Sequence, residues 1–209
     1  MFGNLYDDAL TGERCWLRHD DGSVHGLAVR RWLGGRSRDS GFDTAMVSLC
    51  DGPTIDLGCG PGRLVASLVK LGVPALGVDQ SATAIALARR NGAPALRRDL
   101  FEPLPGTGRW STVLLADGNV GIGGDPPRVL RRAGELLRTG GRCVAEFDMQ
   151  ISGIETRWVR LESAQTVGPW FRWASVGIDG ARRLADDVGL TITAMQPMGQ
   201  RVLATLAVR

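Results

Sequence analysis

The chain has 209 residues, 44% of them hydrophobic and 22% charged, with a net charge of +3. This size and composition are those of a globular protein of about one domain. An excess of only three positive charges, scattered along the sequence, argues against a nucleic-acid partner. No stretch approaches the roughly 18 apolar residues of a membrane helix, and the first residues lack the features of a secretory signal. We expect a cytoplasmic protein with no membrane partner.

Cysteine and histidine usage gives no sign of a metal centre. The four cysteines include no C-x-x-C pair, and the sequence has two histidines. Zinc sites need a tighter grouping of such ligands. We therefore predict no metal site, and free thiols in a reducing compartment.

The first 38 residues show no clear periodicity. A turn at residues 20–22 can join two short strands, because Asp-Asp-Gly is typical of a hairpin turn. Two interpretations stay open for residues 1–38. They form an irregular segment that packs on the domain, or an arm over the active site.

From residue 40 onward, helical and strand patterns alternate. Apolar residues at helical spacing predict a helix over 40–50, and a buried strand over 54–57 is followed by a glycine-rich turn. Further helices are predicted at 63–71, at 82–90 and from Asp125, and further strands at 75–79, 95–99, 111–116 and 142–147. The sequence therefore predicts an α/β fold with a doubly wound, mostly parallel, Rossmann-like sheet covered on both faces.

The last third of the chain has a different pattern. Residues 151–177 form an aromatic β insert, predicted to be an extra hairpin, in which two segments alternate like half-exposed strands. Its aromatic residues either line a substrate pocket or form a small separate core: Trp158, Trp170, Phe171 and Trp173. A helix over 179–188 and a closing antiparallel pair, 191–195 and 201–208, complete a seven-stranded sheet with an antiparallel last strand. With no internal repeat or linker, residues 1–209 are expected to be one domain.

Ligands of such sheets bind at the carboxyl ends of the strands. The predicted strands end in glycines or acids there: Gly58 to Gly62, Asp79, Asp99, Asp117 and Asp148. The dinucleotide fingerprint G-x-G-x-x-G fails, because Arg63 stands in place of its third glycine. A phosphate-binding G-K-[ST] loop is also absent.

The turn at 56–62, Asp-Leu-Gly-Cys-Gly-Pro-Gly, resembles motif I of class I S-adenosylmethionine-dependent methyltransferases. Gly77-Val78-Asp79 and Asp99-Leu100-Phe101 resemble the second and third elements of that family. Residues 137–141 resemble the turn before its fifth strand, with Thr139 in place of proline. The resemblance covers residues 40–209 and implies S-adenosylmethionine as the cofactor. It implies cofactor contacts from Asp56, Gly58, Cys59, Gly60, Gly62, Asp79, Gln80, Asp99, Leu100, Phe101, Ala116 and Asp117.

The resemblance also suggests roles for individual residues. The acid after the second strand, Asp79, would bind the ribose hydroxyls, and Asp99 would meet the adenine amino group. Residues after the fourth strand line the methyl group in this family, which points to the glycine-rich loop 117–124. The candidate catalytic residues are Asp117, Asn119 and His25, with His19, Glu146 and Asp148 as further candidates for a base. Asp117, Asn119 and Asp148 are too few ligands to predict a magnesium site.

The acceptor is not specified by these motifs. Little sequence lies outside the shared core, so we expect a small-molecule acceptor, methylated on oxygen or nitrogen in a biosynthetic pathway. Two alternatives stay open. In the first, the chain binds the cofactor without transferring its methyl group, as a cyclase-like protein would; in the second, it methylates RNA or protein. The oligomeric state is not indicated.

Overall fold

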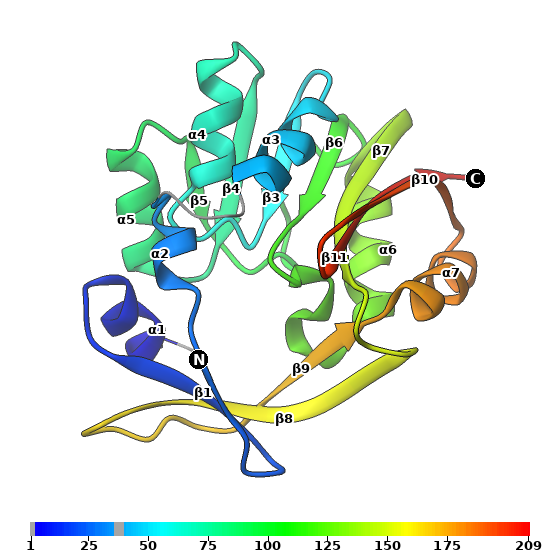
Figure 1. Cartoon of the computed structure of the whole chain (residues 1–209). Helices are drawn as coiled ribbons and strands as arrows, with labels where there is room; N and C mark the ends of the chain where they lie inside the picture. Colours follow the sequence, from blue (N-terminus) through cyan, green and yellow to red (C-terminus); the bar gives the residue numbers. More distant parts are fainter. Residues whose placement is uncertain (1–2, 36–39) are drawn as a thin grey trace.

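The computed structural model describes residues 3–35 and 40–209. Its largest element is a seven-stranded sheet of strand order β10-β11-β7-β6-β3-β4-β5 (Figure 1). The strands are β3 (Thr54–Leu57), β4 (Ala75–Asp79), β5 (Ala95–Arg97), β6 (Trp110–Leu115), β7 (Leu137–Asp148), β10 (Leu190–Met198) and β11 (Arg201–Val208). β11 runs antiparallel to both of its neighbours, and the pairs among β3 to β7 are parallel. The predicted seven-stranded, mostly parallel sheet with an antiparallel last strand is confirmed.

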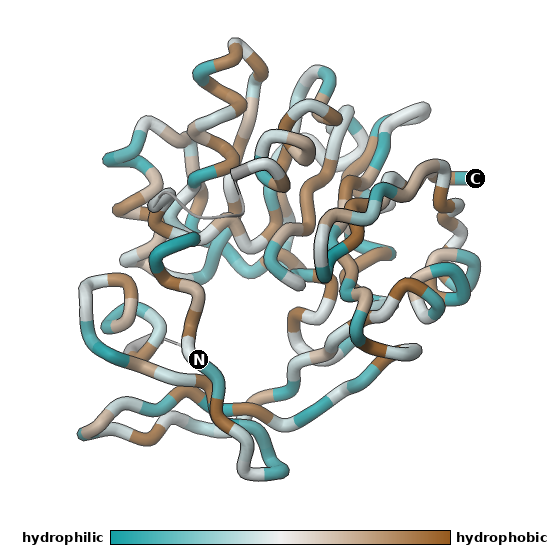
Figure 2. Tube along the Cα trace, in the orientation of Figure 1, coloured by the Kyte–Doolittle hydropathy of each residue, from teal (hydrophilic) through white to brown (hydrophobic). Residues whose placement is uncertain are grey.

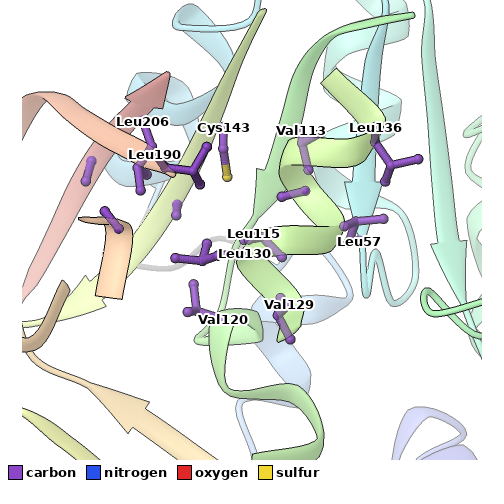
Figure 3. Packing of buried hydrophobic residues seen from close by; sticks show 14 of the residues in the cluster. Leu57, Val113, Leu115, Val120, Val129, Leu130, Leu136, Cys143, Leu190 and Leu206 are labelled. Atoms are coloured by element: carbon purple, nitrogen blue, oxygen red, sulfur yellow. The ribbon is translucent and has the colours of Figure 1, made fainter. Parts of the chain in front are cut away.

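Helices cover both faces of this central sheet. They are α3 (Ser40–Ser48), α4 (Arg63–Lys70), α5 (Ala82–Arg90), α6 (Pro126–Leu136) and α7 (Ile178–Asp187). Successive side chains of a strand point to opposite faces of the sheet, so neighbouring residues of β6 pack into different helical layers. Val113 and Leu115 pack in the cluster that contains α6 and α7 (Figure 3), whereas Leu114 packs with α3 and α4. In Figure 2 the hydrophobic colour gathers along the central strands. The buried core therefore fixes the strand ends on which the site is built.

The residues before α3 and those between β7 and α7 form a second sheet of strand order β2-β1-β8-β9. Its strands are β1 (Cys15–His19), β2 (Val24–Gly26), β8 (Ile154–Ser163) and β9 (Phe171–Val176), and the helices α1 (Gly3–Leu10) and α2 (Val29–Trp32) flank β1 and β2. β1 pairs antiparallel with β8 along its whole length, from Cys15↔Ser163 to His19↔Val159. The two short strands predicted on either side of the turn at 20–22 are confirmed, whereas the alternative of an irregular segment does not hold for 15–26. Residues 1, 2 and 36–38 of the predicted N-terminal segment lie outside the described residues. The expected two-stranded insert is half of a larger sheet.

The glycine-rich stretch after β6 was expected to be a loop, but it forms the 3₁₀ segment η1 (Asn119–Gly124). η1 packs directly on β9, since a Cβ atom at Gly121 would lie 1.7 Å from the carbonyl oxygen of Ala174. Only glycine permits this approach. The second sheet is thereby attached to the end of β6, below the carboxyl ends of the central strands (Figure 1). Within residues 3–35 and 40–209, none of the helices combines the length and apolar character that crossing a membrane requires.

Candidate active site

A cavity of about 950 Å³ lies between the carboxyl ends of the central strands and the second sheet. One wall comes from the ends of β3, β4, β5 and β6, and the facing wall comes from α1, β1, β2, β8 and β9. Small-molecule sites span roughly 300–1,000 Å³. The cavity is therefore large enough for two reactants.

The predicted cofactor residues divide into two groups. Those that line the cavity are Gly58, Cys59, Gly60, Asp79, Gln80, Asp99, Leu100 and Asp117. Those that do not are Asp56, Gly62, Phe101 and Ala116. Gly62 has a packing role instead, because a Cβ atom there would lie 2.8 Å from the Cβ atoms of both Ala88 and Ala93. It lets α4 approach α5 and the segment before β5.

Asp79 organises the turn at the end of β3. Its Oδ2 accepts a hydrogen bond from Gly60 N at 2.9 Å, and its Oδ1 accepts one from Ser81 N at 2.8 Å. Burial raises the pKa of the Asp79 carboxyl, and the hydrogen bonds from Ser81 and Gly60 oppose that shift. A carboxylate has about four lone-pair sites, so two remain for a ligand. The cavity-lining position of Asp79 fits recognition of a diol.

Helix α1 lies against this turn. The Ser81 hydroxyl donates a hydrogen bond to Asp7 Oδ1, and a Cβ atom at Gly60 would lie 3.1 Å from the Tyr6 hydroxyl oxygen. Burial, followed by the charge of Asp79, raises the pKa of the Tyr6 phenol, which therefore stays protonated. The Tyr6 ring is tilted against Trp32, with centroids 5.6 Å apart. Tyr6 and Asp7 line the cavity, and no periodic pattern in residues 1–38 points to them.

Asp56 lies behind the cavity wall and is 2% exposed. Its Oδ1 is buried and has no hydrogen-bond partner among the described residues. Burial raises the pKa of the Asp56 carboxyl to about 7, and Arg63 partly opposes this. Because Asp56 does not line the cavity, its predicted contact with the cofactor has no support in this geometry. Gly60 does line the cavity, and its φ of 52° together with the 3.1 Å approach of a Cβ atom to the Tyr6 hydroxyl favours glycine there, which leaves bare backbone for the amino-acid end of S-adenosylmethionine.

Asp99 closes the far end of the cavity after β5. Its Oδ1 accepts a hydrogen bond from Phe101 N at 2.9 Å, and both Asp99 and Leu100 face the cavity. The Phe101 ring points elsewhere, since the guanidinium of Arg128 stacks over it at 3.8 Å. The adenine-binding prediction therefore retains Asp99 and Leu100, while the contact predicted for Phe101 has no support in this geometry.

Asp117 is clamped by two guanidinium groups. Arg63 reaches its carboxylate at 2.5 Å and Arg31, from α2, at 2.9 Å. The residue has φ of 55°, in the left-handed region that few non-glycine residues adopt. Arg63 also pairs with Asp43 at 2.8 Å. Both carboxylate oxygens of Asp117 are held by guanidinium groups, so the structure favours a positioning role over the predicted catalytic one.

The ion pairs around Asp117 continue to Glu146 of β7 and to Arg201 of the antiparallel strand β11. Glu146 of β7 accepts a hydrogen bond from Asp117 N at 2.9 Å, and it lies 3.4 Å from Arg31 and 3.5 Å from Arg201. Burial, followed by the charge of Asp117, raises the pKa of the Glu146 carboxyl. Glu146 therefore holds the backbone of Asp117 rather than facing the cavity. The ion pairs link α2 to the strand ends across 115 positions of sequence.

Asn119 positions the end of β3. Its amide nitrogen donates to the carbonyl oxygens of Leu57 and Gly58, both at 2.9 Å. With its donors used in this way, Asn119 shapes the turn and does not act as a base. A Cβ atom at Gly58 would lie 2.5 Å from this nitrogen, which explains the glycine.

His25 lines the cavity from β2. It is paired in register with Leu17 of β1, so both side chains lie on the same face of the second sheet. The ring of His19 lies edge-on to it, with centroids 4.9 Å apart. His25 thus lies on the cavity wall opposite the predicted cofactor residues.

Comparison with known proteins gives a consistent identification of the fold. Residues 55–141 match the family model described as "Methyltransferase domain". No curated protein matches the chain in sequence.

Solved structures match nearly the whole chain. A SAM-dependent methyltransferase from Bacteroides fragilis, in complex with S-adenosyl-L-homocysteine, has a TM-score of 0.81 at 19% identity over 97% of this chain and 92% of its own. The CcbJ methyltransferase from Streptomyces caelestis has a TM-score of 0.65 at 18% identity over 85% and 98%. The 1,6-didemethyltoxoflavin-N1-methyltransferase of Burkholderia thailandensis has a TM-score of 0.62 at 16% identity over 81% and 78%. At these identities the likeness concerns the fold.

Proposed function

We propose that the chain is a class I S-adenosylmethionine-dependent methyltransferase that methylates an oxygen or nitrogen atom of a small-molecule acceptor, and its matched methyltransferase domain and its fold support this. The observation that carries this proposal is the cavity of about 950 Å³, with motif I on one wall and the second sheet on the other. In this proposal residues 1–209 work as one domain, and the N-terminal arm and the insert together cover the acceptor.

When bound, S-adenosylmethionine supplies an activated methyl group on a sulfonium, so the protein mainly positions the reactants and excludes water. Asp79 would hold the ribose hydroxyls, Asp99 the adenine amino group, and the turn at Gly60 the amino-acid end. Asp117, clamped by Arg63 and Arg31, would fix the shape of the wall beside the methyl group. Each of these residues binds or orients, and none needs to exchange a proton.

A hydroxyl or protonated amine acceptor must lose a proton as it is methylated. His25 is our candidate for this base, since it lines the cavity from the second sheet and lacks the ion pairs that hold Asp117. Transfer of the proton to its imidazole would leave the acceptor nucleophilic. Replacement of His25 by Gln, with His19→Gln as the neighbouring control, should lower kcat about 10²- to 10⁴-fold.

The position of the cavity between two walls favours a small acceptor over a macromolecule. Both walls belong to this chain, so a large substrate would have to present its reacting atom on a narrow segment. A net charge of +3 also provides little attraction for RNA. One of the fold neighbours is named as a 1,6-didemethyltoxoflavin-N1-methyltransferase and holds 1,6-didemethyltoxoflavin, which supports the proposal of a small-molecule acceptor.

The test is methyl transfer to separated fractions of an extract from the organism that makes the protein. Purified protein and labelled S-adenosylmethionine are incubated with the low-molecular-mass, RNA and protein fractions, and S-adenosylhomocysteine release is measured. We expect release with the low-molecular-mass fraction and none from Gly60→Val, whose side chain would fill the cofactor site. Label in RNA or protein alone contradicts the proposal. So does cofactor binding without release from any fraction, which is the behaviour of a cyclase-like protein.

A further inference from the structure

The wall of the cavity formed by the second sheet is apolar. Leu17 is paired in register with Leu161, and Val159 with Phe171, so these side chains share one face of the sheet. The apolar side chains that line the cavity from this sheet are Leu17, Val159, Leu161, Phe171 and Trp173, joined by Ile122 of η1. A ligand that replaces water along this wall gains hydrophobic free energy.

Two of these side chains are aromatic and belong to one strand. Phe171 and Trp173 are two residues apart on β9, so both rings point into the cavity. Trp158 and Trp170 lie elsewhere, with 49% and 42% of their surface exposed, and neither lines the cavity. The cavity side of β9 thus carries two aromatic side chains among the residues that line the cavity.

Charged groups of the cavity are concentrated on the opposite wall and already have partners. Arg63 pairs with Asp43 and Asp117, Asp79 accepts two backbone N–H groups, and Arg97 donates to the carbonyl oxygen of Gln80. Asp7, Asp99 and Arg98 also bond or pair within the chain. Among the described residues of the second sheet, His25 is the titratable group that lines the cavity. The strands of the second sheet therefore bring no Asp, Glu, Lys or Arg side chain to the cavity, and Asp7 of α1, on the same side, is held by the Ser81 hydroxyl.

We propose that the acceptor is an uncharged aromatic or heteroaromatic ring molecule that stacks on Phe171 and Trp173. Its hydroxyl or ring N–H group faces His25. In the reaction an acceptor oxygen or nitrogen lone pair forms a bond to the methyl carbon, and the carbon–sulfur bond of the cofactor breaks with its electron pair left on sulfur. The acceptor proton passes to the imidazole of His25. This inference rests on the proposed function and specifies its substrate class.

The binding experiment uses protein saturated with S-adenosylhomocysteine and three matched probes. 2-Naphthol is flat and uncharged, decahydro-2-naphthol has the same skeleton without the flat ring, and 6-hydroxy-2-naphthoate adds a carboxylate. Titration calorimetry should give measurable binding of 2-naphthol, with at least tenfold weaker binding of the other two. Equal or tighter binding of either comparison probe, or no binding of 2-naphthol, overturns the proposal.

Substitutions in β9 test whether the ring of 2-naphthol binds against Phe171 and Trp173. Phe171→Ala and Trp173→Ala should each weaken 2-naphthol binding about 10- to 100-fold, because each removes about 1.5–3 kcal/mol of buried contact. Trp158→Ala and Trp170→Ala, on or beside the same strands, serve as matched controls and should leave binding unchanged. Phe171→Leu keeps an apolar side chain but loses the ring, and it should weaken binding about two- to tenfold. Unchanged S-adenosylhomocysteine affinity verifies that each variant is folded.

The outcome separates this inference from the proposed function. If the extract assay yields a methylated small molecule that is aliphatic or charged, the function stands and the substrate class is wrong. If 2-naphthol binding is insensitive to Phe171→Leu, Phe171→Ala and Trp173→Ala in folded protein, the assigned surface is wrong. If no fraction releases S-adenosylhomocysteine, the function itself fails.

Discussion

Replacement of Asp79 tests how the cofactor is held. In the structure its two carboxylate oxygens accept hydrogen bonds from Gly60 N and Ser81 N, and lone pairs remain for the ribose diol. Asp79→Asn keeps the shape of the side chain but places an amide N–H₂ where one oxygen stood. It removes the charge from two ligand hydrogen bonds at once.

The expected loss of cofactor-binding free energy follows from the strength of the hydrogen bonds between Asp79 and the ribose hydroxyls. A hydrogen bond to a charged group contributes about 1.5–3 kcal/mol, so losing the full diol contact in Asp79→Ala should cost about 3–6 kcal/mol of binding free energy. That corresponds to roughly 10²- to 10⁴-fold in Kd. Asp79→Asn retains one acceptor and should lose about half of this free energy. Asp79→Asn should also lower the free energy of unfolding, because its amide N–H₂ faces either Gly60 N or Ser81 N and leaves that donor without an acceptor, at a cost of about 1–3 kcal/mol. The neutral side chain offsets part of this, since burial disfavours the charged form of Asp79 and raises its pKa.

Calorimetric titration with S-adenosylhomocysteine measures the effect, with Asp51→Asn as a control, since the Asp51 side chain is 64% exposed. Wild-type affinity should fall as pH drops through the raised pKa of Asp79, because the protonated carboxyl loses an acceptor, whereas Asp79→Asn should show a flatter profile. An Asp79→Asn protein that is folded and binds with wild-type affinity would refute the ribose assignment.

Further predictions concern stability and the clamp. The folded-state pKa of Asp56 is about 7 against a usual 3.8, so the folded protein binds the extra proton and the unfolding free energy should fall as pH rises from about 4 to 7. Chemical denaturation of Asp56→Asn across this range should show a smaller slope, and an unchanged slope would contradict the assignment. Arg31→Met should destabilise the protein by about 3–5 kcal/mol by leaving buried carboxylates underpaired, and should speed proteolysis before residue 35, whereas the exposed neighbour Arg30→Met should do neither. Gly121→Ala should lower Tm much more than Gly123→Ala, because its Cβ would lie 1.7 Å from a β9 carbonyl oxygen, while Gly123 meets nothing within 4 Å; equal Tm values would argue against the packing of η1 on β9.

The central sheet was predictable because its signals are local. Each strand is an apolar run, each helix has an apolar stripe, and Gly58, Asp79 and Asp99 follow directly on their strands. Such patterns need no knowledge of distant partners. The order of the motifs then identified the cofactor.

The second sheet was not predictable in the same way. β1 pairs with β8 across more than 140 positions, as the Arg18–Glu162 contact illustrates with a separation of 144. Local alternation shows that a segment is a strand but not which partner it takes, or which of its faces is buried. Phe171 and Trp158 were therefore indistinguishable in sequence, although one lines the cavity and the other faces solvent.

In the sequence, Arg63 indicates only that the third glycine of the dinucleotide fingerprint is absent. Its role depends on Arg31, Asp43 and Asp117, which lie on three other elements. A buried ion-pair network leaves no periodic trace in sequence, because its members come together only after the sheet has formed. The clamp on Asp117, and with it the reason to prefer His25 as the base, required the folded structure.

The most direct measurement of the central claim follows the methyl group itself. Purified protein is incubated with S-adenosylmethionine carrying a deuterated methyl group and with the low-molecular-mass fraction, and both products are quantified by mass spectrometry. We predict one deuterated small molecule, formed in equal amount to S-adenosylhomocysteine and lost in Asp79→Ala. Release of S-adenosylhomocysteine with no deuterated small molecule, or label found only in RNA or protein, would contradict the account.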